Sequence, residues 1–415
     1  MSPDRGVSVA PSRRVRDAWA VIVALGITQI IGYGSVFYSF SLLMEPFQQA
    51  LGATKSLVVG AFSVALLVAG LCATFVGGTI DRIGGRMVMA LGSAAAAILL
   101  AALSRVETVV GLYAIYVGLG AAMAAILYEP AFAVLTQIFG SNYRRAITAL
   151  TLFGGLSSSV FWPLTQQLIV HFGWRGALLV LSGLNILVCM PLHLLALPGR
   201  VARSKPGPNS ASDVKDSKSL REVLREPTFY WLGGALVANG LIFSAMSVHM
   251  MPMFQGKGLS ASAAAAIGAL VGPMQVTGRI LELTAGRRFS IVRIGLLAFC
   301  LVPVALFVFA TAGDKVWPLV LFALMYGVSN GVITIVRGAL PAELFGRDHY
   351  GAVSGALAVP GMIALASGPF LASLIWMAMG GSYDRVLLAL CVVSVIGVGF
   401  FFVATRGHRT SRSGK

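Results

Sequence analysis

Long apolar runs separated by short polar segments dominate the chain. Twelve of these runs are long enough for membrane-spanning helices, which need about 20 mostly apolar residues. The runs do not alternate apolar and polar positions, as the strands of a transmembrane barrel do. The pattern therefore predicts an all-α polytopic membrane protein. The expected spans are 18–44, 57–79, 87–104, 110–138, 147–170, 176–197, 228–254, 261–283, 294–312, 318–341, 351–378 and 385–404.

One polar segment, 198–227, is much longer than the other connections between spans. It contains four prolines and many charged residues. It separates two blocks of six spans, so we expect an N-terminal six-helix bundle over 1–197 and a C-terminal bundle over 228–415. The segment between them is expected to be a cytoplasmic linker.

The two blocks resemble copies of one another. A fixed shift of 206 residues superposes glycines and prolines that chance matching of helix formers does not explain. Repeated halves with a site at their interface are typical of transporters. The shift places Phe139-Gly140 on Phe345-Gly346, Gly155 on Gly361, Pro163 on Pro369, and Leu168-Ile169 on Leu374-Ile375.

Composition excludes most other classes of protein. Hydrophobic residues make up 57% of the 415 residues and charged residues only 11%, whereas a soluble domain carries about 25% charged residues. Soluble enzymes, nucleic-acid-binding proteins and disordered scaffolds are therefore excluded. The positions of the basic residues along the chain show that the net charge of +16 reflects membrane topology. Of the 31 Lys and Arg residues, 23 fall on the side of the termini, six on the other side and two inside spans.

This bias predicts a topology and a location. Lys and Arg accumulate in cytoplasmic loops, so we expect both termini in the cytoplasm and an even number of spans. The N-terminus has no secretory signal pattern. Short loops and the absence of a targeting peptide favour a prokaryotic inner membrane, and a monomer is expected. The expected partners are the lipid bilayer, a small-molecule substrate and protons, with no nucleic acid.

A glycine-rich loop between spans 2 and 3 carries the strongest motif. It reads Gly77-Gly78-Thr79-Ile80-Asp81-Arg82-Ile83-Gly84-Gly85-Arg86. This loop resembles the signature G-x-x-x-D-[R/K]-x-G-x-[R/K] of the major facilitator superfamily, in the position typical of that family. Phe172-Gly173-Trp174-Arg175 resembles a second turn common in the same superfamily. The resemblance covers the whole chain and implies twelve helices in two pseudo-symmetric bundles.

The resemblance also implies a gating role for the signature loop, which in the family braces one half against the other. Gly77 is expected to let helices approach closely, and Gly84 to permit a tight turn with the glycine beside it. Asp81 is expected to accept backbone N–H groups or to pair with an arginine. Arg82 and Arg86 are expected to anchor the loop on the cytoplasmic side.

Four ionisable residues lie inside the predicted spans: Glu129, Arg279, Glu282 and Arg337. Such residues are costly in a bilayer and are functional candidates by default. In the family fold, spans 1, 4, 7 and 10 line the central cavity. Glu129 of span 4 and Arg337 of span 10 lie at nearly equal depth, because the 206-residue shift places Glu129 opposite Ile335.

We therefore expect Glu129 to couple transport to protons and Arg337 to contact an anionic substrate. A carboxylate in a dry cavity can take up and release a proton near neutral pH, and arginine offers a charged planar fork to a carboxylate or phosphate. The alternative is a structural salt bridge between the two that locks the inward gate.

Arg279 and Glu282 are three residues apart on span 8 and share a helix face. One interpretation is that they neutralise each other. The other follows from a resemblance to the monocarboxylate-transporter branch of the superfamily, where an arginine in span 8 contacts the substrate anion. Polar residues on the cavity spans, among them Tyr33 and Asn330, are candidate substrate contacts or helix–helix hydrogen bonds. His249 is expected at the membrane interface.

Motifs for other chemistry are missing. The sequence has no phosphate-binding loop for ATP and no catalytic or dinucleotide-binding motif, so we expect neither an enzyme nor a cofactor or metal. The four cysteines, Cys72, Cys189, Cys300 and Cys391, lie in apolar runs. They are expected to be small buried hydrophobes, and the alternative is contact with a soft metal or metalloid.

The favoured function is proton-coupled transport of a small organic anion by alternating access. The alternative is export of a toxic small molecule, such as a trivalent arsenical or a drug. Span 5 reads Gly154-Gly155-Leu156-Ser157 and lacks the Gly-Pro pair typical of drug–proton antiporters in the family. An aromatic vitamin such as riboflavin is a third option.

Overall fold

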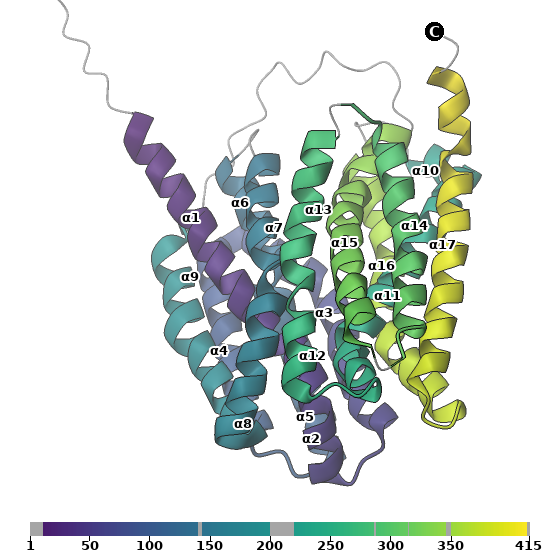
Figure 1. The fold of residues 1–415 in the computed structure, drawn as a ribbon. Helices are drawn as coiled ribbons and strands as arrows, with labels where there is room; N and C mark the ends of the chain where they lie inside the picture. Colours follow the sequence, from purple (N-terminus) through teal and green to yellow (C-terminus); the bar gives the residue numbers. More distant parts are fainter. Residues whose placement is uncertain are drawn as a thin grey trace, which may run out of the picture.

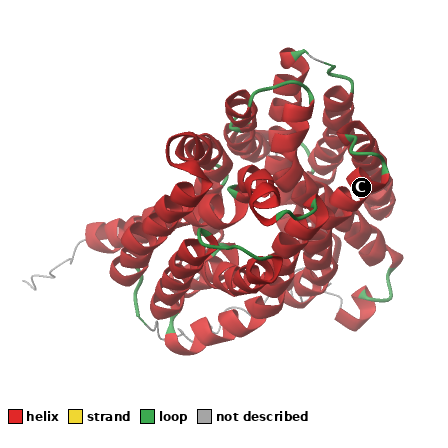
Figure 2. Ribbon diagram, turned by 90° about the horizontal axis from the view of Figure 1, so that it is seen from below, coloured by secondary structure: helices red, strands yellow, loops and turns green. Residues whose placement is uncertain are grey.

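The computed structural model describes residues 11–139, 143–199, 220–285, 288–313, 315–345 and 350–412, and regular structure in these ranges is entirely helical (Figure 2). Most of the predicted linker, with Gly140 and Gly346 of the repeat, lies outside the described residues. The first half contains α1 (Pro11–Gly32), the π-helix η1 (Tyr33–Tyr38), α2 (Phe40–Leu51), α3 (Lys55–Ile83), α4 (Gly85–Leu103), α5 (Val109–Ile126), α6 (Tyr128–Phe139), α7 (Tyr143–Gly154), α8 (Ser157–Leu184), the π-helix η3 (Asn185–Cys189) and α9 (Met190–Ala196).

The second half follows the short helix α10 (Leu220–Val223). It contains α11 (Pro227–Gly256), α12 (Ala261–Gly268), α13 (Val271–Ala285), α14 (Ile291–Ala310), α15 (Val316–Phe345), α16 (Tyr350–Ala378) and α17 (Tyr383–Arg412). Hydroxyl groups cap several helices. The side chains of Thr108, Ser260 and Ser290 accept a backbone N–H of the first turns of α5, α12 and α14, which satisfies donors that have no partner inside the helix.

The helices supply the predicted number of membrane spans. Eleven helical stretches of the described chain are long and apolar enough to cross a membrane. One of them, Arg145–Ala196, has 52 residues and is bent at Gly173, where φ is 67°. It is long enough to cross twice, since one crossing takes about 20 residues. Twelve spans and the all-α fold class are therefore confirmed.

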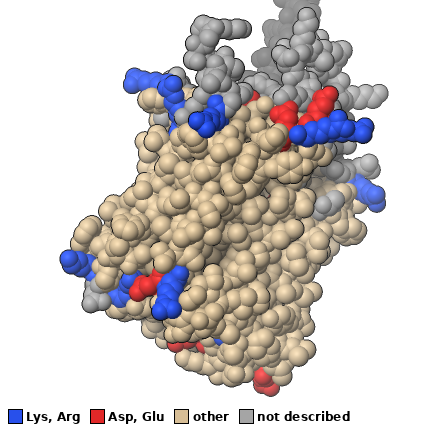
Figure 3. Space-filling view, turned by 90° about the vertical axis from the view of Figure 1, so that its right-hand side faces the viewer, with Lys and Arg blue, Asp and Glu red and all other residues tan. Residues whose placement is uncertain are grey.

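The two sides of the bundle are distinguished by the chain ends. α1 begins and α17 ends on one side, which we call the terminus side, and the opposite side is called the far side (Figure 1). Charged side chains on one face gather toward its two ends and leave a broad belt without charge between them (Figure 3). Such a belt matches the hydrocarbon layer of a bilayer, where charges are costly.

Each half packs mainly on itself, and a few helix pairs make the most extensive contacts between the halves within the described residues. α3 packs on α5 in the first half, and α11 packs on α16 and α17 in the second. Between the halves, α3 packs on α16, α2 on α11, and α8 on α12 and α13. The pseudo-symmetric prolines Pro163 and Pro369 lie inside α8 and α16 respectively. The candidate site lies where α13 of the second half meets the first.

Several spans near this boundary are broken. The first span changes from α1 to the π-helix η1, and the fourth is interrupted at Leu127 between α5 and α6. The fifth is interrupted at Gly155 and Leu156, between α7 and α8. Their counterparts in the second half, α11, α15 and α16, run as single helices of about the full bilayer thickness. Interrupted helices in transporters are typical of binding sites, because they expose backbone groups to a ligand.

Candidate functional site

Arg279 is the centre of the candidate site. It lies on α13 of the second half and is only 3% exposed. Its Nη1 donates to the backbone carbonyl of Thr151 on α7 of the first half, and the guanidinium also interacts with the neighbouring side chain of Tyr128 on α6. The charge of one half is therefore held by the other half.

The carbonyl that receives Arg279 belongs to a helix end. α7 ends at Gly154, and the Thr151 oxygen also accepts the N–H of Gly155. The last carbonyls of a helix lack partners and carry partial negative charge. The guanidinium thus adds a second hydrogen bond to the Thr151 carbonyl and places a positive charge at the negative end of α7, which a continuous span would not present.

Close packing of α13 positions Arg279. A Cβ at Gly278 would meet the backbone carbonyl of Val328 on α15, and a Cβ at Gly272 would lie 2.6 Å from the carbonyl oxygen of Gly155. These glycines let α13 lie directly against α15 and α8. A Cβ at Gly155 would lie 3.0 Å from Nη1 of Arg279, so the backbone of Gly155 lies close to this side of the guanidinium.

Tyr128 and Glu129 reach the site because α6 starts beside it. Leu127 has an extended backbone, with ψ of −154°. Pro130 in the first turn of α6 lacks the N–H that would continue α5. Glu129 therefore lies at a helix N-terminus, where a negative charge is stabilised. Its side chain is exposed, and it acts electrostatically on the neighbouring Tyr33.

The π-helix η1 brings two tyrosines to the same place. The rings of Tyr33 and Tyr128 have centroids 4.8 Å apart, and Tyr38 lies within electrostatic range of Arg279. The indole Nε1 of Trp162 donates to the Tyr38 carbonyl at 3.1 Å and fixes this segment to α8. We refer to Tyr33, Tyr38, Tyr128, Glu129 and Arg279 as the Arg279 cluster.

The cluster retains hydrogen-bonding capacity. Nε of Arg279 is buried and has no hydrogen-bond partner among the described residues. A guanidinium has five N–H donors in a fixed fork, and a buried charged donor without a partner is costly. An anion bound against Arg279 would satisfy it, and the tyrosine rings would provide apolar contact beside the charge.

The structure separates some of the predicted site residues. Tyr33, Glu129 and Arg279 come together, whereas Glu282 is half-buried one turn further along α13. Arg337 is exposed on α15. Asn330 is 6% exposed, and its Nδ2 donates to the Tyr326 carbonyl at 2.8 Å.

The two salt bridges weighed from the sequence are not seen. No ion pair joins Glu129 to Arg337, or Arg279 to Glu282, within the part of the chain that the structure describes. Arg279 turns instead toward α7 and α6, because the end of α7 supplies acceptors there. Equal depth in the membrane therefore does not bring Glu129 and Arg337 into an ion pair, and a shared helix face does not bring Arg279 and Glu282 into one.

The signature loop follows its predictions in part. Gly84 has a φ of 87°, in the region that favours glycine, and forms the turn between α3 and α4. Arg82 is exposed, and Arg86 donates through Nε to the Leu194 carbonyl of α9, within its own half. The prediction for Gly77 is wrong, because no described atom lies within 4 Å of a Cβ built there. The side chain of Asp81 lies outside the described residues.

Two further predictions concern titratable groups. His249 was expected at the membrane interface but is 0% exposed, with its ring bonded to Tyr383 and Pro369. The four cysteines are free thiols, of which Cys189 is buried and the other three half-buried. Among the described residues, no group of His, Cys, Asp and Glu could hold a metal ion.

Sequence reasoning missed Tyr128, Thr151 and Trp162 as parts of the site. Pro130 was an available signal, because proline three residues after Leu127 predicts an interruption of span 4. Thr151 contributes only a backbone oxygen, which no side-chain pattern reveals. Trp162 looked like an apolar residue of span 5.

Comparison with known proteins places the chain among membrane transporters. The sequence model described as Major Facilitator Superfamily matches residues 25–369. Monocarboxylate transporter 11 of Homo sapiens is 29% identical over 367 residues, covering 82% of this chain and 74% of its own length. Monocarboxylate transporter 13 of Rattus norvegicus is 25% identical, covering 80% and 76% respectively.

Solved structures share the fold. A bacterial homologue of the human lysosomal transporter Spinster has a TM-score of 0.71 at 16% identity and covers 96% of this chain and 98% of its own. The human organic anion transporter MFSD10 has a TM-score of 0.63 at 18% identity and covers 94% of this chain and 100% of its own.

Proposed function

The chain belongs to the Major Facilitator Superfamily and is a multi-pass membrane transporter of small solutes, and from this premise we propose that it carries a small organic anion, of the monocarboxylate class, together with a proton. The observation that carries the proposal is Arg279. It is a buried guanidinium held across the boundary between the halves, with an N–H that has no partner within the described ranges.

The proposal assigns the anion to Arg279. A guanidinium binds a carboxylate through two parallel hydrogen bonds. An anion bound through the available Nε and the end of α7 bonded to Nη1 would then share one guanidinium. The substrate would thereby be sensed by both halves, as alternating access requires. The similarity to monocarboxylate transporters supports this class of substrate.

The proton is assigned to Glu129. This carboxylate lies next to Tyr33, and Tyr128 links it to Arg279, so its charge and that of a bound anion would be sensed at one site. Protonation of Glu129 would reduce the repulsion between the carboxylate and the substrate anion. Arg337, exposed on α15, is proposed as an anion contact on the way to the terminus side.

The proposal also includes topology. The bias of 23 of 31 basic residues toward the termini supports a cytoplasmic terminus side in a prokaryotic inner membrane. A monomer with one linker between the bundles is part of the same proposal. Export of arsenicals gains no support from the Arg279 cluster, which contains no thiol and whose cation suits an anion.

Uptake into proteoliposomes tests the proposal. Radiolabelled lactate, pyruvate and benzoate would be offered under an inward proton gradient. We expect Arg279→Lys to lower uptake about 30-fold or more, because lysine keeps the charge but loses the two-pronged contact with the carboxylate in a buried site. Arg288→Lys, an exposed arginine beyond the same helix, is the matched control and should transport normally. Equal uptake by Arg279→Lys and the parent would contradict the anion assignment.

A separate measurement tests the proposal that Glu129 carries the proton. We expect Glu129→Gln to retain exchange of labelled for unlabelled anion and to lose accumulation driven by the proton gradient. Exchange needs no net proton movement, so the two assays separate coupling from binding. Full gradient-driven accumulation by Glu129→Gln would contradict the assignment.

A further inference from the structure

A second cation crosses the boundary between the halves on the far side. Lys55 begins α3, and its Nζ lies 3.1 Å from the hydroxyl oxygen of Tyr383 on α17 and 3.7 Å from the ring centroid of Trp376 on α16. An ammonium over an aromatic face is attracted by the ring. The neighbouring Ser56 donates to Sδ of Met377 at 2.8 Å. The first residues of α3 are therefore bound to the second half.

A buried histidine contacts the same tyrosine. Nδ1 of His249 on α11 lies 3.2 Å from the same Tyr383 hydroxyl, and its Nε2 lies 2.9 Å from the carbonyl oxygen of Pro369. His249 is 0% exposed. We call Lys55, His249, Trp376 and Tyr383 the Lys55 cluster.

The direction of each hydrogen bond follows from its partner. A carbonyl oxygen only accepts, so Nε2 of His249 carries the hydrogen that it donates to Pro369. An ammonium only donates, so the Tyr383 oxygen accepts from Lys55. The Tyr383 hydroxyl hydrogen is then free to point at Nδ1, which must be unprotonated to accept it. The arrangement requires a neutral His249.

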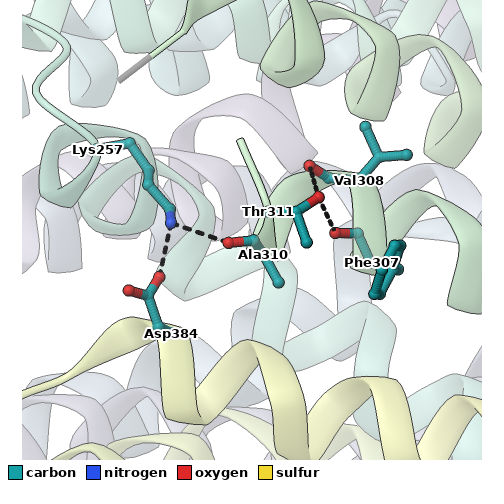
Figure 4. A network of polar contacts seen from close by, with 6 residues as sticks. All are labelled: Lys257, Phe307, Val308, Ala310, Thr311 and Asp384. Atoms are coloured by element: carbon teal, nitrogen blue, oxygen red, sulfur yellow. Dashed lines mark hydrogen bonds and ion pairs between the residues drawn. The ribbon is translucent and has the colours of Figure 1, made fainter. Parts of the chain in front are cut away.

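The second half holds Tyr383 firmly. The adjacent Asp384 forms an ion pair with Lys257 at 2.7 Å, and Lys257 also donates to the carbonyl of Ala310 at 3.1 Å (Figure 4). These contacts tie the end of α11 and the end of α14 to the start of α17. Tyr383 is therefore attached to the second half, and its contact with Lys55 depends on whether His249 accepts the hydrogen of its hydroxyl group.

A proton on His249 removes this arrangement. Nδ1 would become a donor, so Lys55 and His249 would both donate to one oxygen, and the Tyr383 hydrogen would lose its acceptor. Two cations would then share a neighbour, and one of them, His249, is fully buried, so the like charges repel and the buried charge is costly. Separation of the halves on the far side relieves both costs, because it admits water to His249.

Other charged groups near the cluster have different partners. Glu45 of α2 acts on Lys55 and Tyr383 but is exposed and bonded to Gln49. Asp384 is engaged by Lys257. α12 and α16 carry no charged residue in their sequences. Once the far side opens and water reaches His249, its imidazole can take up a proton in the mildly acidic range that is usual for histidine.

We propose that His249 is a proton-binding site that controls closure of the far side: the neutral imidazole completes the Lys55 cluster and keeps the halves together, and the imidazolium releases them. The proton binds the open state and not the closed one, so acid shifts the population toward the open state. The ratio of open to closed molecules rises by up to about tenfold per pH unit below the point where the open state titrates. In the orientation proposed above, the far side faces outward.

Distance measurement by double electron–electron resonance tests the proposal without any substrate, so its outcome is independent of the anion assignment. Spin labels would be attached at Glu107→Cys and Lys315→Cys, two exposed far-side positions in different halves, after the four native cysteines are replaced by serine. In nanodiscs, we expect a longer-distance population that grows several-fold between about pH 7.5 and about pH 5.5.

The variants identify the group responsible. His249→Asn keeps an acceptor for Tyr383 but does not titrate, so its distances should not change with pH. His171→Asn removes an exposed far-side histidine that bonds only its own helix and should respond like the parent. If His249→Asn does not fold, Tyr383→Phe provides the test. It removes the hydroxyl group that bonds both His249 and Lys55, and it should also abolish the change of distance with pH. A parent without a pH response, or variants at positions 249 and 383 that keep it, would overturn the proposal.

Discussion

Arg279 and Lys55 cross the boundary between the halves in opposite directions, and their surroundings differ. Arg279 reaches from the second half to a helix end of the first and keeps one buried N–H that no group in the described part of the chain accepts. Lys55 reaches from the first half to a hydroxyl and an aromatic face of the second. The incomplete set of partners around Arg279 suits a cation that binds a ligand. The more complete set around Lys55 suits a cation that holds the two halves together.

The largest expected effect separates these two roles. Arg279→Met should lower anion affinity about 100-fold, because the substrate carboxylate loses its charged partner in a buried site. The pH response of the far-side distances should remain, since the Lys55 cluster is untouched. Calorimetric titration with benzoate and the spin-label measurement check the two statements. Loss of both properties together would show that the clusters act as one unit.

Glycine substitutions compare how the two regions are packed. Gly278→Ala should destabilise the protein by about 1–3 kcal/mol, because the new Cβ meets the backbone carbonyl of Val328, which cannot rotate away. Gly60→Ala, one turn beyond Lys55, meets the terminal hydroxyl of Tyr113, which can move. It should cost much less. Thermal unfolding in detergent measures both, and equal losses would contradict this contrast in packing.

Removal of the far-side cation should have a smaller effect. Lys55→Met loses a partly buried cation–π contact and a hydrogen bond, together worth about 1–2 kcal/mol. The open population on the far side should rise about 5- to 30-fold at every pH, while anion affinity measured by the same titration stays near the parent value. If the far side of Lys55→Met stays closed, Lys55 does not contribute to holding the halves together.

The smallest effect is expected from Lys257→Gln. The partner Asp384 has a side chain that is 66% exposed, and exposed ion pairs contribute about 0–1 kcal/mol. The unfolding temperature should fall slightly, and the difference should shrink in high salt, because salt screens exposed charges. A large loss that salt does not reduce would show that the Ala310 contact dominates instead.

The sequence allowed the fold to be predicted because a bilayer imposes a simple rule. Each span must be apolar over its length, and basic residues accumulate on one side, so twelve spans and their grouping follow from composition along the chain. Charges inside spans are rare for the same reason. This made Arg279 and Glu129 visible as candidates without any knowledge of their contacts.

The contacts of these residues could not be predicted in the same way. Equal depth suggested that Glu129 faces Arg337, but depth does not fix rotation about the helix axis. The break at Leu127 and the π-helix η1 alter rotation locally, and Arg279 bonds a backbone carbonyl. His249 appeared interfacial by its place in span 7, yet a neighbouring helix turn from the second half covers it.

The π-helix η1 has a consequence for the register of the first span. A π turn holds an additional residue, and each residue in a helix turns the chain by about 100°. Residues before Tyr33 are therefore rotated relative to those after Tyr38, so that Gln29 bonds Ile126 inside its own half while Tyr38 faces the other half. One inserted residue thus lets a single span serve two partners, and deletion of one residue between positions 33 and 38 would restore a uniform helix whose two ends could no longer both be correctly oriented.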